Sequence, residues 1–233
     1  MEPAPAVQQN LHRLTDEPPG TPGIPGLACG IVRARRRCIM EPMPRIPPVD
    51  RPATYEDLMK VPDTMVAEIV DAELHATPRP ALPHAHVTSA LGMLIGGPYH
   101  HGRGGPGGWW ILDEPELHFA KDVLVPDLAG WRRSRLPRVP DAAYSSLAPD
   151  WVCEVLSPST ASLDRVKKMT IYARERVAHA WLLDPALRTL EVLRLEAGRW
   201  AILATYGGSD TVRAEPFDDI DLELTSLWAS ERP

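Results

Sequence analysis

The stretch that decides the fold is Asp150-Trp-Val-Cys-Glu-Val-Leu-Ser-Pro-Ser-Thr160, followed by a polar segment that reaches Arg176. The first half of this stretch is apolar except for one carboxylate, Glu154, and a short apolar run of this kind predicts a buried strand. Its second half breaks the strand, and Ser159 or Thr160 is expected to cap a helix that follows. A buried carboxylate is costly unless it is paired or binds a metal. The stretch therefore predicts a strand and a helix that frame a site.

The expected helix carries three residues that recur every four positions, Asp164, Lys168 and Tyr172. Residues at this spacing share one face of a helix. Each has an ordinary explanation by itself, since Asp164 with Lys168 forms a common helical ion pair and Tyr172 is typical of half-buried packing. Their combination with Glu154 in the preceding strand favours a site that holds a carboxylate and a lysine.

Two further acids, Glu68 and Asp127, also interrupt apolar segments. A hard cation such as magnesium needs oxygen ligands, and one or two carboxylates with water and phosphate usually suffice. Asp127 and Glu154 on neighbouring strands could bind such an ion, which would polarise a phosphodiester and activate water. Lys168 could stabilise the charge that develops on the phosphate or help orient the water. A single acid at a strand end is more often a cap or an exposed residue, so the inference depends on the combination.

Composition indicates an ordinary globular protein. The chain has 233 residues, of which 44% are hydrophobic and 24% charged. Its three cysteines have no CxxC spacing, and Cys153 lies in the apolar run, which predicts reduced thiols, no zinc site and a cytoplasmic location. No apolar run approaches membrane-spanning length, and the first residues lack the pattern of a signal peptide. The net charge of -6 argues weakly against a protein that coats nucleic acid, but it does not exclude a nuclease whose carboxylates hold a metal.

Residues 1–52 differ from the rest of the chain. They contain eleven of the 26 prolines and show no hydrophobic periodicity, which predicts a disordered or loosely attached extension before a domain at 53–233. Arg33-Ala-Arg-Arg-Arg37 is either a tail that contacts nucleic acid or, more simply, a solvated arginine-rich segment. Translation from Met40 or Met43 would instead make this segment a start-site extension.

The remaining pattern predicts an α/β fold, with a mixed sheet flanked by a helix before its central strands and a helix after them. The polar loop 132–148 holds Arg132, Arg133, Arg135 and Arg138, which either form a phosphate-contacting lip or are simply exposed. The expected helices are 54–58, capped by Thr54 with Asp57, and 86–95, ended by Gly96-Gly97-Pro98, with a proline-rich loop at 78–83 before the second. The expected strands are two in 65–77 around a turn at 71–72, three at 109–112, 116–119 and 122–128, the central ones at 151–156 and 180–184, and a peripheral antiparallel meander at 190–195, 200–205 and 211–214, before a closing segment at 222–228.

Several segments together resemble the Uma-two family of endonucleases, in the PD-(D/E)XK nuclease superfamily. The resemblance covers residues 54 to 228 and leaves out the proline-rich start. It implies a restriction-endonuclease-like fold. The segments that carry it are Glu68-Ile-Val-Asp-Ala-Glu73, the proline-rich loop ending in His84, Val125-Pro-Asp127, Glu154-Val-Leu-Ser-Pro-Ser-Thr160, the spaced Asp164, Lys168 and Tyr172, and Ala180-Trp-Leu-Leu-Asp-Pro185.

The resemblance also implies roles for residues of this chain. Asp127 and Glu154 would bind the metal, Glu68 would lie near the metal or its waters, and Lys168 would be the catalytic lysine. Asp164 and Tyr172 would support Lys168. His84 would lie at the edge of the site, with His86 as a competitor two residues away.

The chain departs from the pattern at two positions. Leu156 occupies the place where the superfamily usually has its lysine, so the resemblance implies that the lysine has moved to the helix. Ala72 stands where the family commonly has glycine, so this turn is expected to differ slightly in conformation or strain.

The leading hypothesis from the sequence is a magnesium- or manganese-dependent DNA endonuclease. It is expected to act as a homodimer through an exposed sheet edge or through residues 222–228. The alternative is a catalytically inactive binding or assembly protein that keeps the nuclease fold, which the acidic balance favours. A third possibility is a metal-dependent hydrolase of another phosphate ester, because a fold does not fix a function.

Overall fold

The structure, a computed structural model, describes residues 51–228. These residues all belong to one compact unit, 45–233. The predictions for the N-terminal extension, its arginine cluster and its alternative starts lie outside the described residues. Within the described part, no helix is both long enough and apolar enough to cross a membrane.

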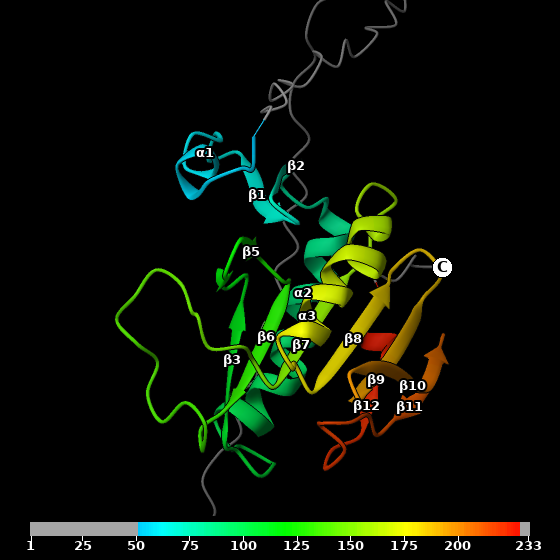
Figure 1. The fold of residues 1–233 in the computed structure, drawn as a ribbon. Helices are drawn as coiled ribbons and strands as arrows, with labels where there is room; N and C mark the ends of the chain where they lie inside the picture. The colour runs from blue at the N-terminus through cyan, green and yellow to red at the C-terminus, as the bar shows by residue number, and fades with distance from the viewer. Residues whose placement is uncertain (1–50, 229–233) are drawn as a thin grey trace, which may run out of the picture. The chain divides into compact units, whose positions relative to one another are not determined.

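A six-stranded mixed sheet forms the centre of the unit, with strand order β10-β9-β8-β7-β6-β3 (Figure 1). Strand β7 (Trp151–Val155) is parallel to β8 (His179–Asp184), and every other neighbouring pair in this sheet is antiparallel. Both predicted central strands are therefore present. The other strands are β3 (Trp109–Asp113), β6 (Leu128–Arg132), β9 (Thr189–Glu196) and β10 (Arg199–Gly207).

A second sheet of four strands, in the order β2-β1-β5-β4, carries Glu68 on β1. The predicted hairpin is present, and a turn at Asp71 and Ala72 joins its two strands. The strands are β1 (Met65–Val70), β2 (Glu73–Pro78), β4 (Leu117–Phe119) and β5 (Asp122–Leu124). Two short strands, β11 (Thr211–Val212) and β12 (Leu222–Glu223), pair separately before a 3-10 turn, Leu224–Ser226.

Helices cover both faces of the six-stranded sheet. Helix α2 (Leu82–Ile95) packs with the side chains of Cys153 and Val155 on one face. The π-helical segment η2 (Leu163–Lys168) and helix α3 (Met169–Arg174) pack on the other face with Val152 (Figure 1). Because side chains alternate along a strand, Glu154 shares the face of Val152 and points toward α3. A short helix, α1 (Tyr55–Leu58), is capped as predicted, with the Thr54 amide donating to Asp57 Oδ2 over 3.0 Å.

Helix α2 differs from its predicted bounds at its start, whereas its end at Ile95 is as predicted. It begins at Leu82 rather than at residue 86, because proline is tolerated in the first turn, where its missing N–H has no partner to lose. The α-helix ends before the Gly96-Gly97-Pro98 run, but the chain continues in a helical turn through these residues. Residues Gly96–His100 form a π-helical turn, η1, in which the His101 amide donates to Gly96 O over 3.0 Å.

The predicted strand 122–128 is two strands that belong to different sheets. Pro126 cannot donate a ladder hydrogen bond, so β5 ends at Leu124 and β6 begins at Leu128. Strand β6 runs on from the end of that predicted strand to the first residue of the expected loop, Arg132, and it pairs with β7. The predicted meander also differs, because β9 and β10 extend the central sheet through β8 while β11 pairs only with β12.

Candidate active site

The candidate site is built around the ammonium group of Lys168, which is buried with 2% of the residue exposed. Its Nζ lies 2.9 Å from Glu154 Oε1 and 3.0 Å from Glu68 Oε1. It also lies 3.4 Å from Asp164 Oδ1, one helical turn earlier. The three carboxylates come from β7, β1 and η2, so the lysine joins both sheets to the helix. A buried ammonium group needs such partners, because burial without them would strongly disfavour its charge.

Tyr172 completes the contacts of Glu154. Its hydroxyl donates to Glu154 Oε1 over 2.5 Å, and both side chains are buried. The predicted convergence of Asp164, Lys168 and Tyr172 on one side is thus present. The backbone differs from the regular helix that was expected, because residues 163–168 are π-helical. Single π-helical turns within a longer helix are frequent at functional sites.

Asp127 lies directly before β6, just after the proline that separates the two sheets. Its Oδ2 accepts a hydrogen bond from the Val155 amide over 2.7 Å. Its Oδ1 lies 3.3 Å from His84 Nε2. His84 Nδ1 is buried and has no hydrogen-bond partner within the described residues. His86 is exposed, as expected for a residue about 200° further round the same helix, so His84 is the histidine at the site.

The electrostatics of the cluster reflect an excess of negative charge. Burial raises the pKa of Asp127 to about 6, although the nearby His84 opposes this effect. Burial also raises the pKa of Glu154 well above its usual value, against the attraction of Lys168. Burial alone would lower the pKa of Lys168, but Glu154 and Glu68 outweigh it and raise that pKa. The lysine is therefore held in its charged form among acids that outnumber it.

The donor set suits a hard divalent cation. Carboxylate oxygens are the ligands that magnesium and manganese prefer, and a further positive charge would relieve the repulsion among the four acids. In the described part of the chain, no three His, Cys, Asp or Glu side chains are arranged as a metal-binding group. Lys168 instead holds Glu68 and Glu154. A metal would therefore have to replace part of the lysine's contact with these carboxylates.

The cluster opens into a cavity of 340 Å³. Its wall includes Arg79, which lies 3.2 Å from Glu114 and was not among the predicted site residues. Nothing in the sequence distinguishes this arginine from others in a polar loop. The acids, the lysine and His84 line the cavity together with the hydroxyl-rich segment after β7, namely Ser157, Ser159 and Thr160.

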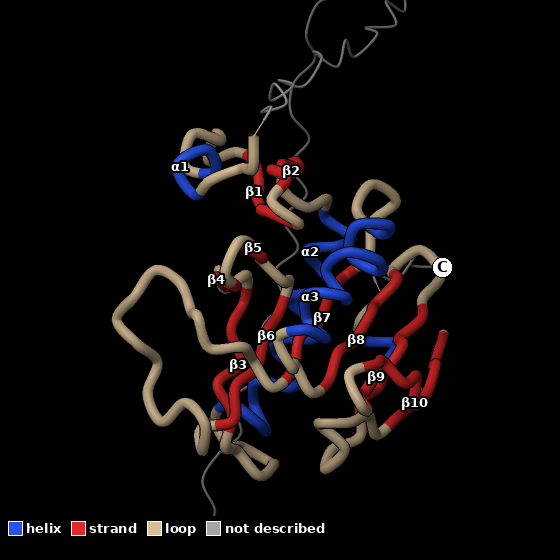
Figure 2. Tube along the Cα trace, in the orientation of Figure 1, coloured by secondary structure: helices blue, strands red, loops and turns tan. Residues whose placement is uncertain are grey.

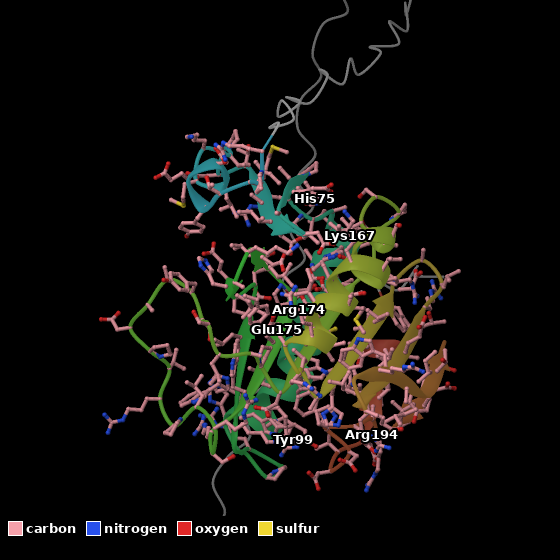
Figure 3. All side chains as sticks on the ribbon, viewed as in Figure 1. His75, Tyr99, Lys167, Arg174, Glu175 and Arg194 are labelled. Carbon is pink, nitrogen blue, oxygen red and sulfur yellow. The ribbon has the colours of Figure 1, made fainter. Side chains whose placement is uncertain are left out.

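Ion pairs fix the β1–β2 hairpin against the helix. Lys167 Nζ donates to Glu73 over 2.8 Å, and Glu73 Oε2 lies 3.7 Å from His75 (Figure 3). Arg174 donates to Asp122 over 2.8 Å. These contacts set the position of Glu68, on the hairpin, relative to Lys168 on the helix.

The arginines at the end of β6 and in the long loop between β6 and β7, a tan segment in Figure 2, are mostly engaged within the protein. Arg132 lies over the Trp109 ring at 4.5 Å. Arg133 donates to His100 O over 2.7 Å, and Arg135 lies 2.9 Å from Asp150. The idea that they form a phosphate-contacting lip is not supported by these three contacts.

Residues 52–225 match the sequence pattern of the Uma2 family, described as "Putative restriction endonuclease". The chain belongs to the Uma2 family. No curated protein matches it.

Among solved structures, one described as "a putative nuclease belonging to DUF820 from Anabaena variabilis ATCC 29413" is similar, at 23% sequence identity with a TM-score of 0.62. The match covers 76% of this chain and 98% of that one. At this identity the likeness shows the fold, and the predicted restriction-endonuclease-like fold is confirmed. The Uma2 assignment supports a nuclease.

Proposed function

We propose that this Uma2 protein is a magnesium- or manganese-dependent endonuclease that hydrolyses DNA. The observation that carries the proposal is the cluster of Glu68, Asp127 and Glu154 with Lys168 in one cavity. A buried lysine surrounded by more carboxylates than it can neutralise is costly if the cluster serves only to stabilise the fold. The acids that remain unneutralised repel one another. A divalent metal would offset this surplus negative charge and could then bind a phosphate at the cavity.

Each residue has a role in this proposal. Asp127 and Glu154 would hold the metal, and Glu68 would bind it or its waters. A bound metal would polarise the phosphate and supply a nucleophilic water near neutral pH. Lys168 would stabilise the negative charge that develops on the phosphate. Asp164 would hold this lysine directly, Tyr172 would hold Glu154, and His84 would orient Asp127 through its Nε2.

Metal binding and cleavage test the proposal in one experiment. The wild type is titrated with Mn²⁺ and Mg²⁺ by calorimetry, and the same samples are assayed on supercoiled, linear and single-stranded DNA. We expect Asp127→Ala and Glu154→Ala to lose metal binding. Lys168→Ala should lower the nicking rate by at least about 100-fold. Asp141→Ala, which removes an exposed acid of the long loop, is the matched control and should behave like the wild type.

The possible outcomes separate the three hypotheses from the sequence. Metal binding without cleavage of any DNA would favour a hydrolase of another phosphate ester. A folded wild type that binds neither metal would contradict the proposal and favour a binding or assembly protein. The homodimer and the cytoplasmic location stay predictions, and light scattering that returns a monomer at micromolar concentration would contradict the first.

A further inference from the structure

A second hollow lies on the outer side of the η2–α3 helix, between the helix and the β9–β10 turn. It has a volume of 640 Å³ and shares no lining residue with the cavity at Lys168. Four arginines line it and no acid does, although the whole chain has a net charge of -6. We call it the arginine groove. Its lining is Arg165, Met169, Thr170, Ala173, Arg174, Arg176, Gly198, Arg199 and Trp200.

Two of the four arginines are fixed by ion pairs, and two are not. Arg165 lies 2.7 Å from Glu191 and Arg174 lies 2.8 Å from Asp122, so these side chains help to build the wall. Arg176 and Arg199 are exposed, and among residues 51–228 neither has a carboxylate partner. Their charges are therefore available to an anion from outside.

The walls around these free arginines are ordered by the fold. Trp200 is partly buried, and its indole Nε1 donates to Met169 O over 2.8 Å, which ties the β10 strand to the helix. Ala197 and Gly198 have φ values of 49° and 80°, as a tight hairpin turn requires. The turn brings Arg199 to the groove while Arg176 reaches it from the end of the helix. An anion would therefore meet charges from two separate elements.

The groove and the candidate active site lie on adjacent faces of one helix. Arg165, Met169 and Ala173 each follow directly after a residue of the site, and successive helical residues are about 100° apart. The distance from Arg165 to Arg174 along the helix is roughly 13 Å at ~1.5 Å per residue. Arg165 and Arg174 are already paired with acids, so the free charges of the groove are Arg176 and Arg199. A nucleic-acid strand, which carries a charge about every 3.4 Å, can offer a phosphate to each of them.

We propose that the arginine groove binds the phosphodiester backbone of a nucleic acid, beside the cavity that holds Lys168. The inference rests on the proposed function and adds to it a substrate-holding surface outside the catalytic residues. Backbone contacts of this kind position a strand without reading its sequence. Trp200 offers an apolar wall against which a sugar or base can pack.

The test measures DNA affinity apart from cleavage. Fluorescence anisotropy with a labelled 20-nucleotide single strand and the matching duplex is recorded in EDTA, over a range of salt. We expect Arg176→Gln/Arg199→Gln to weaken binding about tenfold and to reduce the salt slope by about two, for two lost phosphate contacts. The control, Arg103→Gln/Arg213→Gln, removes two exposed arginines elsewhere and should match the wild type. Competition with inorganic phosphate distinguishes a site for single phosphates from one for the polymer.

Each outcome bears on the groove separately from the active site. Equal affinity of the groove variant and the control, or absence of wild-type DNA binding, would overturn the inference. Displacement of DNA by millimolar phosphate with an unchanged salt slope would also overturn it, since the groove would then hold one phosphate. Loss of affinity in the groove variant with intact Mn²⁺ binding would support it. DNA binding through the groove by a protein that never binds metal or cleaves would support the groove and contradict the nuclease.

Discussion

At the scale of single residues, Asp127 carries a conflict between stability and proposed function. Burial disfavours its charged form and raises its pKa from 3.8 to about 6. A folded state that holds a proton more tightly than the unfolded state loses stability as the pH rises through this window. The cost is absent below about pH 4 and complete above about pH 6. Carboxylates that must be deprotonated to bind metal often carry such a cost.

We therefore expect Asp127→Asn to stabilise the metal-free protein at pH 7.5 by roughly 3 kcal/mol, since one pKa unit corresponds to about 1.4 kcal/mol. The asparagine oxygen can still accept from the Val155 amide, so the fold keeps that contact. At pH 4 the gain should nearly vanish. Urea denaturation in EDTA at both pH values measures it, with Asp141→Asn as a control. An equal loss of stability at both pH values would show that the contact with His84 outweighs the buried charge.

At the scale of elements, the β1–β2 turn places Ala72, where the resemblance implied a glycine, in a left-handed backbone conformation. Ala72 has a φ of 64° and Asp71 a φ of 53°, so both central residues are left-handed. Left-handed backbone costs a residue with a Cβ about 1–2 kcal/mol. The expected strain at Ala72 is therefore borne out by its backbone, while the strand pairing of the hairpin is complete.

We expect Ala72→Gly to raise the free energy of unfolding by about 0.5–1 kcal/mol, because relief of the strain exceeds the added freedom of glycine in the unfolded chain. Ala76→Gly, in the neighbouring strand β2, should instead lower it by a similar amount. Chemical denaturation of the two variants checks the opposite signs. Destabilisation of both to the same degree would mean that the turn is not strained.

The sequence predicted the elements whose signal is local and missed those that depend on neighbours. The β7 and β8 strands are apolar runs apart from Glu154 in β7 and the two end residues of β8, and such short runs indicate buried strands. Strand β6 contains Gly130, which weakens a strand signal. Tertiary packing explains the glycine, since a Cβ at residue 130 would lie 3.2 Å from Trp151 and 3.3 Å from Trp109. The π-helical turns were missed because the spacing of polar residues does not distinguish i+4 from i+5 hydrogen bonding.

The candidate site was predictable from the sequence in its membership but not in its contacts. Acids that interrupt apolar strands led to Glu68, Asp127 and Glu154, and helical spacing led to Lys168. The sequence could not show that Lys168 contacts the carboxylates of both sheets, because the two sheets meet only in three dimensions. The same limit applies to Asp122, which no pattern marked.

At the scale of the whole described unit, Asp122 links the parts that carry the site. It is fully buried, its Oδ1 accepts from the Asp71 amide over 2.7 Å, and its Oδ2 accepts from Arg174 over 2.8 Å. One carboxylate thus joins the hairpin turn, strand β5 and helix α3. Glu68 belongs to the hairpin and Lys168 to the helix, so this link helps to set the distance between them.

We expect Asp122→Ala to lower the free energy of unfolding by about 2–4 kcal/mol, because it leaves the Asp71 amide and Arg174 without their buried partner. Arg174→Ala is the informative comparison, since it breaks the same ion pair but keeps the hydrogen bond to the Asp71 amide.

If the link positions the site, Asp122→Ala should also weaken Mn²⁺ binding and speed amide exchange in β1 while the exchange of β7 and β8 stays slow. Uniformly faster exchange in both sheets would show that Asp122 supports the fold as a whole. Unchanged Mn²⁺ affinity with faster exchange in β1 alone would show that the metal does not depend on Glu68. The position of the hairpin therefore decides whether Glu68 belongs to the metal site or only to the lysine.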